Sequence, residues 1–585
     1  MRKMRILALL LALCCLLSAC GLTNFFRDTV QDSDGPLSAE GKRYSTIYYG
    51  QTVDTPSFDE IRYERPDVEA LIADFGEVTS AVKDGAAAQE VIDAALPVIE
   101  EYYQFATMDS VAYIYYCSDT VENADYLEEY DYLENQQPLV SKAMEEFLVA
   151  CANAPIKEEL ETLYFGEDAL DEYVDYSVYT NETYVSLSRQ ENELVTQYMA
   201  EMEDPTITID GQDVSLNDLL ESGQYDESEL EDEYLRQKTQ TLGEIYIRLV
   251  KLRRQMAQTL GYESYADYAY AVEYERDFTP EQATDYLEAV KAQLVPIFKK
   301  YYFSGEWYYL STADMDEDEL TQALSDSMKL LGKPFTEAYG FMTKHGLYDA
   351  SYNENKWIGS YMTYLNSYEA PYVYLCPEGT SSDFTTFAHE FGHFTDSFLN
   401  YDGGESIDSA EVFSQGLEYL ALLNNRLDDE VCETLLEQVM FDSLQCFVFQ
   451  SSYADFERQV YALDDEALTV EKVCDIALQV SKDYGYYFKD AEDYYRRSWT
   501  QIPHFFNAPY YIISYCVSND AAMQIFELEY EKQGNGRKTY LQMIENSHTL
   551  SFCEMLEDAK LNVPFEQTHM ESLAQIFRKI LLGRD

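Results

Sequence analysis

Basic side chains are scarce in this 585-residue sequence. It has 40 Lys and Arg residues against 108 Asp and Glu residues, which gives a formal net charge of −68 at pH 7. Because so acidic a chain repels the phosphate backbone, the charge excludes a nucleic-acid-binding protein. The charge is typical of a solvated surface that keeps a protein monomeric, and it is also compatible with attraction of cationic peptides. Charge alone does not choose between these two interpretations.

Paired cysteines and long apolar runs are also lacking. None of the 11 cysteines forms a CxxC pair, so the spacing indicates neither a zinc–thiolate site nor a redox pair. The apolar run at residues 6–17 is too short to span a bilayer comfortably. It follows Arg2, Lys3 and Arg5, and the combination is typical of an export signal covering residues 1–19.

The end of this signal carries a recognisable sequence, Leu17-Ser18-Ala19-Cys20-Gly21. Small residues before a cysteine resemble the lipobox of bacterial lipoproteins, and that resemblance implies cleavage before Cys20 and attachment of a diacylglycerol to its sulfur. Two acyl chains suffice for stable membrane anchoring. Residues 20–45 would then be a flexible tether, and the protein would be exported and lipid-anchored at the extracytoplasmic face of the bacterial cell membrane.

Most of the remaining sequence predicts helices, so we expect a mainly α fold. Apolar residues recur at three- and four-residue spacing in 68–82 and 234–257. Alternation ending in Asp210-Gly211 predicts a β-hairpin at 206–211, and Thr279-Pro280 predicts a helix start. We place a lobe boundary there, giving an N-terminal lobe at 46–275 and a catalytic lobe at 276–585. A short strand is predicted at 371–376, with Pro371 suited to an edge strand.

The chemistry is concentrated in His389-Glu390-Phe391-Gly392-His393, inside a helix predicted over 382–399. Residues four apart share a helix face, so both imidazoles can bind one ion, and Glu390 can reach a water on that ion. Five phenylalanines on this helix are expected to anchor it in the core, namely Phe384, Phe387, Phe391, Phe394 and Phe398. The alternative is a pair of buried structural histidines, which is improbable by chance in a chain with six histidines.

A catalytic zinc needs a third protein ligand. A longer three-histidine pattern would place histidine at position 399, but Leu399 stands there. Glu411 follows the Gly403-Gly404 turn and lies on a second predicted helix, which an antiparallel return would bring to the metal. Spacing leaves other carboxylates in competition, namely Asp396, Asp402, Asp408 and Glu418.

Two consecutive segments resemble the thimet oligopeptidase and oligoendopeptidase F family of zinc metallopeptidases. They are residues 389–393 and the later run Glu411-Val412-Phe413-Ser414-Gln415-Gly416-Leu417-Glu418. The resemblance runs from about residue 234 to the C-terminus, and the gap before Glu411 is shorter than in the family pattern. It implies that Glu411 is the third zinc ligand. It also implies a two-lobed, helical, zincin-like fold with a small β edge near the active site and a central substrate channel.

The segment from Pro503 to Tyr515 resembles the family segment that stabilises the transition state. On that resemblance we favour His504 and Tyr515, then Tyr511, over Tyr510 as donors to the developing oxyanion. We expect Pro509 to begin a helix, His504 to lie on the preceding loop, and the two tyrosines four apart to share a face.

The sequence therefore predicts an endopeptidase with one Zn²⁺ per chain that cleaves short unfolded oligopeptides, with Glu390 as the general base. The substrate is expected to pair with the strand at 371–376. Two alternatives stay open: a peptide-binding lipoprotein with a structural metal site, and a zinc exopeptidase or dipeptidase of similar helical fold. Neither the cleavage preference nor any disulfide follows from the sequence.

Overall fold

A computed structural model describes most of the chain, in the ranges 55–166, 169–174, 182–203, 205–209, 211–400, 406–547, 549–565 and 567–583. The predicted signal, Cys20, the tether, Asp402 and the Gly403-Gly404 turn lie outside the described residues. Among the residues described, no helix combines the length and apolar composition needed to cross a bilayer. All eight cysteines in these ranges are free thiols.

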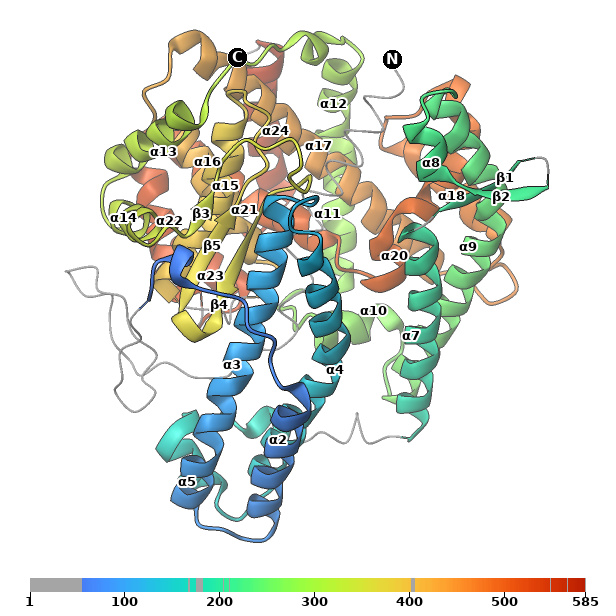
Figure 1. The fold of residues 1–585 in the computed structure, drawn as a ribbon. Coiled ribbons are helices and arrows are strands. Elements are labelled where there is room, and N and C mark those ends of the chain that lie inside the picture. The colour runs from blue at the N-terminus through green and yellow to red at the C-terminus, as the bar shows by residue number, and fades with distance from the viewer. Residues whose placement is uncertain are drawn as a thin grey trace.

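The fold is mainly helical, as predicted (Figure 1). The first half of the chain contains α2 (Val68–Lys83), α3 (Ala88–Ser118), α4 (Asp125–Ala152), α5 (Lys157–Leu160), α7 (Glu182–Glu203), α8 (Leu216–Glu221), α9 (Glu227–Thr259) and α10 (Tyr265–Tyr268). Helices α2, α3 and α4 pack together and form the arm at the bottom of Figure 1. The predicted hairpin is present as antiparallel β1 (Thr206–Ile209) and β2 (Gln212–Ser215).

The second half of the chain adds another run of helices around a small sheet. The helices are α11 (Pro280–Gln293), α12 (Val295–Tyr302), α13 (Glu317–Leu331), α14 (Phe335–His345), α15 (Asp383–Asn400), α16 (Ala410–Leu423), α17 (Asp429–Tyr461), α18 (Val470–Asp483), α19 (Glu492–Arg497), α20 (Pro503–Asn507), α21 (Ile513–Glu531), α22 (Asn535–Asn546), α23 (Phe552–Ala559) and α24 (Gln567–Leu582). The predicted start of α11 is confirmed, since Thr279 and Gln282 form a reciprocal capping box. The predicted lobe boundary at 275/276 stays a prediction.

Strand β5 (Ala370–Tyr374) is the centre of a three-stranded sheet, in the order β3-β5-β4, with β3 (Tyr348–Asp349) parallel and β4 (Tyr361–Leu365) antiparallel to it. The prediction that residues 371–376 form an edge strand is therefore wrong. Val373 and Leu375 donate their N–H groups to Leu347 and Asp349, so Pro371 faces the same side, just before β3 begins. No strand of the described chain lies opposite Pro371 on that side, so the sheet loses no hydrogen bond through the missing N–H. Proline is therefore tolerated in this central strand.

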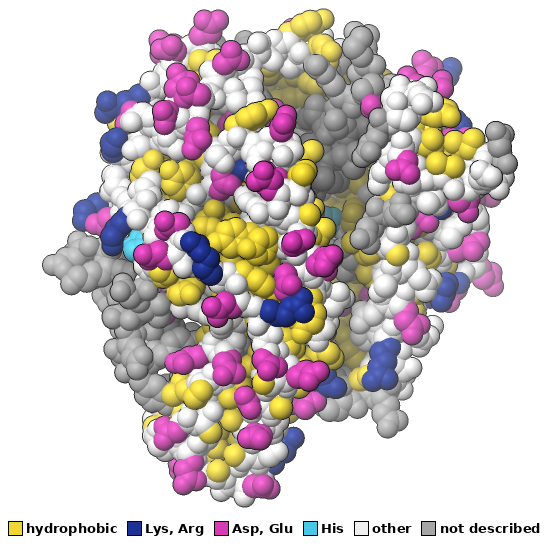
Figure 2. Space-filling view, in the orientation of Figure 1, with side chains coloured by type: hydrophobic (Ala, Val, Ile, Leu, Met, Phe, Trp, Pro, Cys, Tyr) yellow, Lys and Arg dark blue, Asp and Glu magenta, His cyan; other side chains and the backbone are white. Residues whose placement is uncertain are grey.

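The sheet and its neighbouring helices form the support for α15, which packs against β4, β5, α13, α14 and α22. In Figure 1 this assembly lies to the left, and α7, α8 and α9 lie to the right. Figure 2 shows that the surface is hollowed between the α4 side and the α7 side. A single large hydrophobic core runs through most of the described chain, and a smaller cluster lies under the β1-β2 hairpin.

Candidate active site

Helix α15 carries the histidine pair and is held at its start by its own first residue. The Asp383 carboxylate accepts the backbone N–H groups of Glu378, Gly379 and Thr380 at 2.8–2.9 Å. A carboxylate at this position also interacts favourably with the helix dipole. The five phenylalanines expected to anchor the helix are all buried, with at most 5% of any of them exposed. The helix is therefore rigidly placed, and so are the two imidazoles on its open face.

His389, His393 and Glu411 converge on one point, with one donor atom from each within 4.8 Å of the others. The Nε2 atoms of His389 and His393 lie 3.4 and 3.7 Å from Glu411 Oε2. The two imidazole rings are 5.3 Å apart and nearly perpendicular. The antiparallel return expected from the sequence is thus present, since α16 brings Glu411 back to α15.

The close approach of α15 and α16 depends on Gly392. A Cβ atom added there would lie 2.5 Å from both the Phe413 carbonyl oxygen and the Ser414 Cα atom. Backbone atoms cannot move aside as a flexible side chain can, so only glycine fits at this crossing. The glycine between the two histidines thereby sets the distance from the imidazoles to Glu411.

The competing carboxylates occupy other positions. Asp396 accepts a hydrogen bond from Asn400, and Asp408 forms an ion pair with Arg276. Glu418 lies behind His389, with its Oε2 atom 3.3 Å from His389 Nδ1. A carboxylate on the far ring nitrogen fixes the tautomer of a metal-binding histidine. From the sequence, Glu418 was one of the carboxylates that competed for the third-ligand position. Its spacing did not show that it would lie behind His389 instead.

The protonation states suit a divalent cation. Burial lowers the pKa of His393 to about 4, so its ring is neutral at pH 7 and offers a nitrogen lone pair. Burial alone would raise the pKa of Glu411, but the hydrogen bond to His389 and the charges that both histidines carry when protonated lower it to about 2. Ser414 also donates to Glu411 Oε2 at 2.7 Å. Two imidazoles and one ionised carboxylate are a known donor set of catalytic zinc, so these residues fit that ion.

Glu390 lies beside the group formed by His389, His393 and Glu411 and is not part of it. Its side chain is buried, and burial raises its pKa to about 7, with the His389 charge opposing and the Glu411 and Glu418 charges adding to the rise. The Met362 N–H of β4 faces this carboxyl group. The Oε2 atom has no hydrogen-bond partner among the described residues. A buried carboxyl oxygen of this kind beside the histidine pair is available to exchange a proton with a water.

His504, Tyr511 and Tyr515 form a second cluster. His504 Nε2 is 3.3 Å from the Tyr515 hydroxyl, and the His504 ring lies 5.6 Å from that of Tyr511. Burial lowers the pKa of His504 to about 4, so at pH 7 it is neutral and can donate one N–H. The expected helix placement is wrong, because Pro503 begins α20 with His504 inside it, and Tyr511 precedes α21. The two tyrosine rings nevertheless meet at 5.1 Å.

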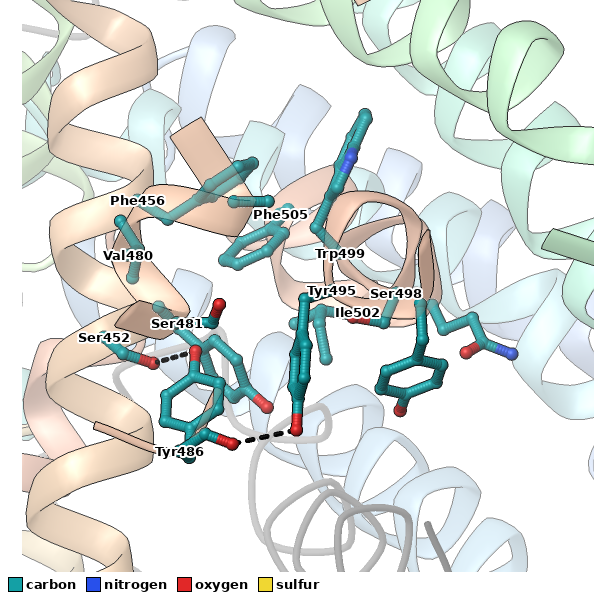
Figure 3. A pocket seen from close by; sticks show the side chains of 14 residues that line it. Ser452, Phe456, Val480, Ser481, Tyr486, Tyr495, Ser498, Trp499, Ile502 and Phe505 are labelled. Carbon is teal, nitrogen blue, oxygen red and sulfur yellow. Dashed lines mark hydrogen bonds between the residues drawn. The ribbon is translucent and has the colours of Figure 1, made fainter. Parts of the chain in front are cut away.

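Aromatic packing holds α20 in place. The Phe506 ring stacks on Tyr198 at 3.7 Å, and Phe505 stacks on Phe456 at 4.6 Å. Figure 3 shows Phe456 and Phe505 together with Trp499 in the wall of the adjoining pocket. Helix α21, which begins beside Tyr515, packs against α16, which carries Glu411. The two clusters therefore lie on neighbouring helices.

Comparison with known proteins agrees with this arrangement. The model described as the Peptidase M3 N-terminal domain matches residues 58–171, and the model described as Peptidase family M3 matches residues 335–575. Together they cover more than half of the chain, including every candidate site residue of α15, α16, α20 and α21. A search of curated proteins finds no match.

Solved structures share the fold. PZ peptidase A with an inhibitor is 22% identical at a TM-score of 0.69, covering 90% of this chain and 99% of that one. A Bacillus anthracis structure assigned as an oligoendopeptidase F is 22% identical at a TM-score of 0.67, with coverages of 91% and 99%. Oligoendopeptidase F from Enterococcus faecium is 15% identical at a TM-score of 0.56, with coverages of 88% and 96%. The chain belongs to peptidase family M3 and is a metallopeptidase.

Proposed function

We propose that the protein is a zinc-dependent endopeptidase that hydrolyses short unfolded oligopeptides. The observation that carries this proposal is the convergence of His389, His393 and Glu411 beside the buried carboxyl group of Glu390. A closed structural zinc site has four protein ligands and needs no base next to it. Three donors with an adjacent base favour a site that leaves one position open for water and substrate.

The roles of the side chains follow from their positions. Zinc, when bound, supplies a Lewis acid that polarises the scissile carbonyl group and acidifies a water. Glu390 accepts the proton of the attacking water and passes it to the leaving amine. His504 and Tyr515 donate hydrogen bonds to the carbonyl oxygen as negative charge develops there, with Tyr511 as the next candidate. Glu418 holds the His389 ring in its ligating orientation.

The substrate is proposed to lie along β4, the end strand of the sheet in the order β3-β5-β4. An extended peptide gains main-chain hydrogen bonds by adding to such an edge. Met362 of β4 has its N–H beside Glu390, which places this edge next to the base. Pairing along an edge aligns a peptide without reading its ends, which supports endopeptidase over exopeptidase cleavage.

The test compares wild-type protein with Glu390→Gln. We expect Glu390→Gln to retain about one zinc per chain by metal analysis and to lose at least about a thousandfold in kcat on quenched fluorescent peptides. Mass spectrometry of a digested peptide library distinguishes internal cleavage from release of terminal residues or dipeptides. Retained turnover in Glu390→Gln would remove Glu390 as the base, and peptide binding without cleavage by the zinc-loaded wild type would favour a binding protein.

The cellular location is a separate proposal, which rests on the resemblance of Leu17-Ser18-Ala19-Cys20 to a lipobox. We propose that the protein is exported as a monomer and anchored to the membrane by lipid on Cys20. Two acyl chains would hold it there stably. Cys20→Ala should move the protein from the membrane fraction to the soluble fraction, and unchanged fractionation would refute the anchor.

A further inference from the structure

Tyr510 has a backbone conformation that non-glycine residues rarely adopt. Its φ angle is +65°, in the left-handed region, and its ring is buried among the aromatic side chains of Tyr265, Tyr270 and Tyr461. Such a conformation costs free energy and persists only where surrounding contacts enforce it. Tyr511 follows directly, so the conformation of Tyr510 sets the direction in which the chain presents Tyr511.

Two buried side chains hold this conformation, those of Glu457 and Arg276. Both carboxyl oxygens of Glu457 lie 3.2 Å from the Tyr510 nitrogen, whose N–H donates to them. Arg276 Nη1 donates to the Tyr510 carbonyl oxygen at 2.9 Å, and Nη2 donates to the Tyr511 carbonyl oxygen at 3.4 Å. The polar groups on both sides of Tyr510 are thus held by side chains from distant parts of the chain.

The Arg276 side chain is fully buried and also contacts the segment that precedes Glu411. Its Nε atom donates to both oxygens of Asp408 at 3.3 Å, and neither side chain is exposed. Asp408 lies three residues before Glu411, and its carbonyl oxygen accepts a hydrogen bond from Ser518 of α21 at 2.7 Å. One guanidinium therefore contacts the segment that leads to Glu411 and the segment that carries the tyrosines.

We propose that Arg276 is a positioning residue, which together with Glu457 fixes Tyr511 and Tyr515 relative to the metal ligand Glu411. The planar guanidinium donates in three directions at once: to Asp408, to the Tyr510 and Tyr511 carbonyls, and to Ser514 Oγ at 2.8 Å. A lysine ammonium has no such fork. This inference rests on the proposed function, since it concerns the donors assigned there.

Loss of the Arg276 hydrogen bonds is expected to displace Tyr511 and Tyr515 and to leave the metal site intact. Donors to an oxyanion must lie within a few tenths of an ångström of their working position, and an error of about 1 Å can cost about a hundredfold in rate. The metal-binding side chains have supports of their own, since Glu418 lies against His389 Nδ1 and Ser414 donates to Glu411 Oε2.

The main test uses Arg276→Lys, which retains a cation beside Asp408 but loses the fork. A second variant, Arg276→Gln with Asp408→Asn, replaces the buried pair by a neutral one in case the lysine disturbs folding. The matched control is Arg254→Gln. Arg254 likewise binds backbone carbonyls, those of Val460, Tyr461 and Leu463, but donates to none in the 504–515 segment.

We expect Arg276→Lys to lower kcat by about 10- to 100-fold with KM changed by less than about threefold, and with zinc content unchanged. Tyr515→Phe should lower kcat by about 100-fold in the wild-type background but by less than about fivefold in Arg276→Lys, because the displaced hydroxyl no longer contributes. Arg254→Gln should retain wild-type kcat. A kcat within twofold of wild type in both Arg276 variants, or effects of Arg276→Lys and Tyr515→Phe that multiply, would overturn the proposal.

A readout independent of activity is hydrogen exchange of the zinc-free protein, followed on peptides covering residues 506–515 and 383–400. We expect exchange in 506–515 to be at least about tenfold faster in Arg276→Lys, with 383–400 unchanged. Unchanged exchange in 506–515 would overturn the proposal. If zinc-loaded wild-type protein cleaves no peptide, the proposed function fails, whereas the exchange result still reports whether Arg276 orders the segment.

Discussion

At the scale of single residues, the site depends on how neighbours set the state of each side chain. Burial keeps His393 neutral, and the two histidines keep Glu411 ionised, with a pKa of about 2. A carboxylate can share a metal ion with the two histidines only if one of its oxygens lies close to both imidazole nitrogens. In an acidic chain many carboxylates lie near the histidines in sequence, and Glu411 is the one that meets this condition among the described residues.

The residue-scale prediction concerns the third ligand. Glu411→Gln should lower zinc affinity by at least about a hundredfold, because it removes the anionic oxygen between the two histidines. The control is Asp396→Asn, at a carboxylate that the sequence also offered as a third ligand. Asp396 accepts a hydrogen bond from Asn400 instead, so this variant should bind zinc with wild-type affinity. Competition with a chromophoric chelator measures both affinities. Zinc loss in Asp396→Asn with retention in Glu411→Gln would reverse the assignment.

Residue-level reasoning from the sequence reached the histidine pair because a four-residue helical spacing places side chains on one face whatever the tertiary fold. It did not reach Arg276 or Glu457, and it named Asp408 only as a competing carboxylate, because these residues are far apart in the sequence and come together only in the folded chain. It also left Glu418 among the carboxylates that compete for the third-ligand position. Nothing in the spacing separates a glutamate that contacts the ion from one that orients a ligand.

At the scale of elements, the contact between α15 and α16 creates the site. Gly392 permits this contact, since the backbone of Phe413 and Ser414 lies where its side chain would be. The sheet contributes at the same scale, because β5 is covered on both edges and β4 is the end strand. The aromatic and β-branched residues of the segment predicted a strand at 371–376 but carried no information about its neighbours.

The element-scale prediction is that Gly392→Ala separates the two helices. Backbone overpacking of this kind costs about 1–3 kcal/mol in stability, and zinc affinity should fall by about 10- to 100-fold as Glu411 moves away from the histidines. Gly340→Ala in α14 is the control, because a Cβ there meets nothing within 4 Å and alanine favours a helix. Thermal unfolding and zinc titration check both. Wild-type zinc affinity in a folded Gly392→Ala protein would contradict this account of the helix crossing.

At the scale of the whole molecule, self-repulsion from the net charge of −68 opposes a compact fold, and ionising a partly buried carboxyl group costs further free energy. Asp109 on α3 is an example. Burial, then the charge of Glu134, raises the pKa of Asp109 to about 8, and its Oδ1 atom has no hydrogen-bond partner among the described residues. The ordinary value, which applies to the unfolded chain, is 3.8. Between these two values the folded protein holds a proton that the unfolded chain releases.

It follows that the contribution of Asp109 to stability is lost as pH rises toward 8, with a slope of at most about 1.4 kcal/mol per pH unit. Asp109→Asn should flatten the dependence of the free energy of unfolding on pH between about pH 6 and 8, and should be more stable than wild type at pH 8. Denaturant unfolding of zinc-free protein at several pH values measures this. Parallel pH profiles for the two proteins would show that Asp109 ionises in the folded state as it does in the unfolded chain.

The amino-acid sequence by itself determined the local features: the helical character, the hairpin at 206–211, the capping box at Thr279 and the face shared by His389 and His393. These depend on neighbours within a few residues, so periodicity and capping chemistry suffice. The tertiary structure alone decided which carboxylate meets the histidines, which strand ends the sheet, and how Arg276 joins α16 to the tyrosine segment. Those features arise from contacts between segments more than a hundred residues apart or from the packing of neighbouring elements, and no local pattern records them.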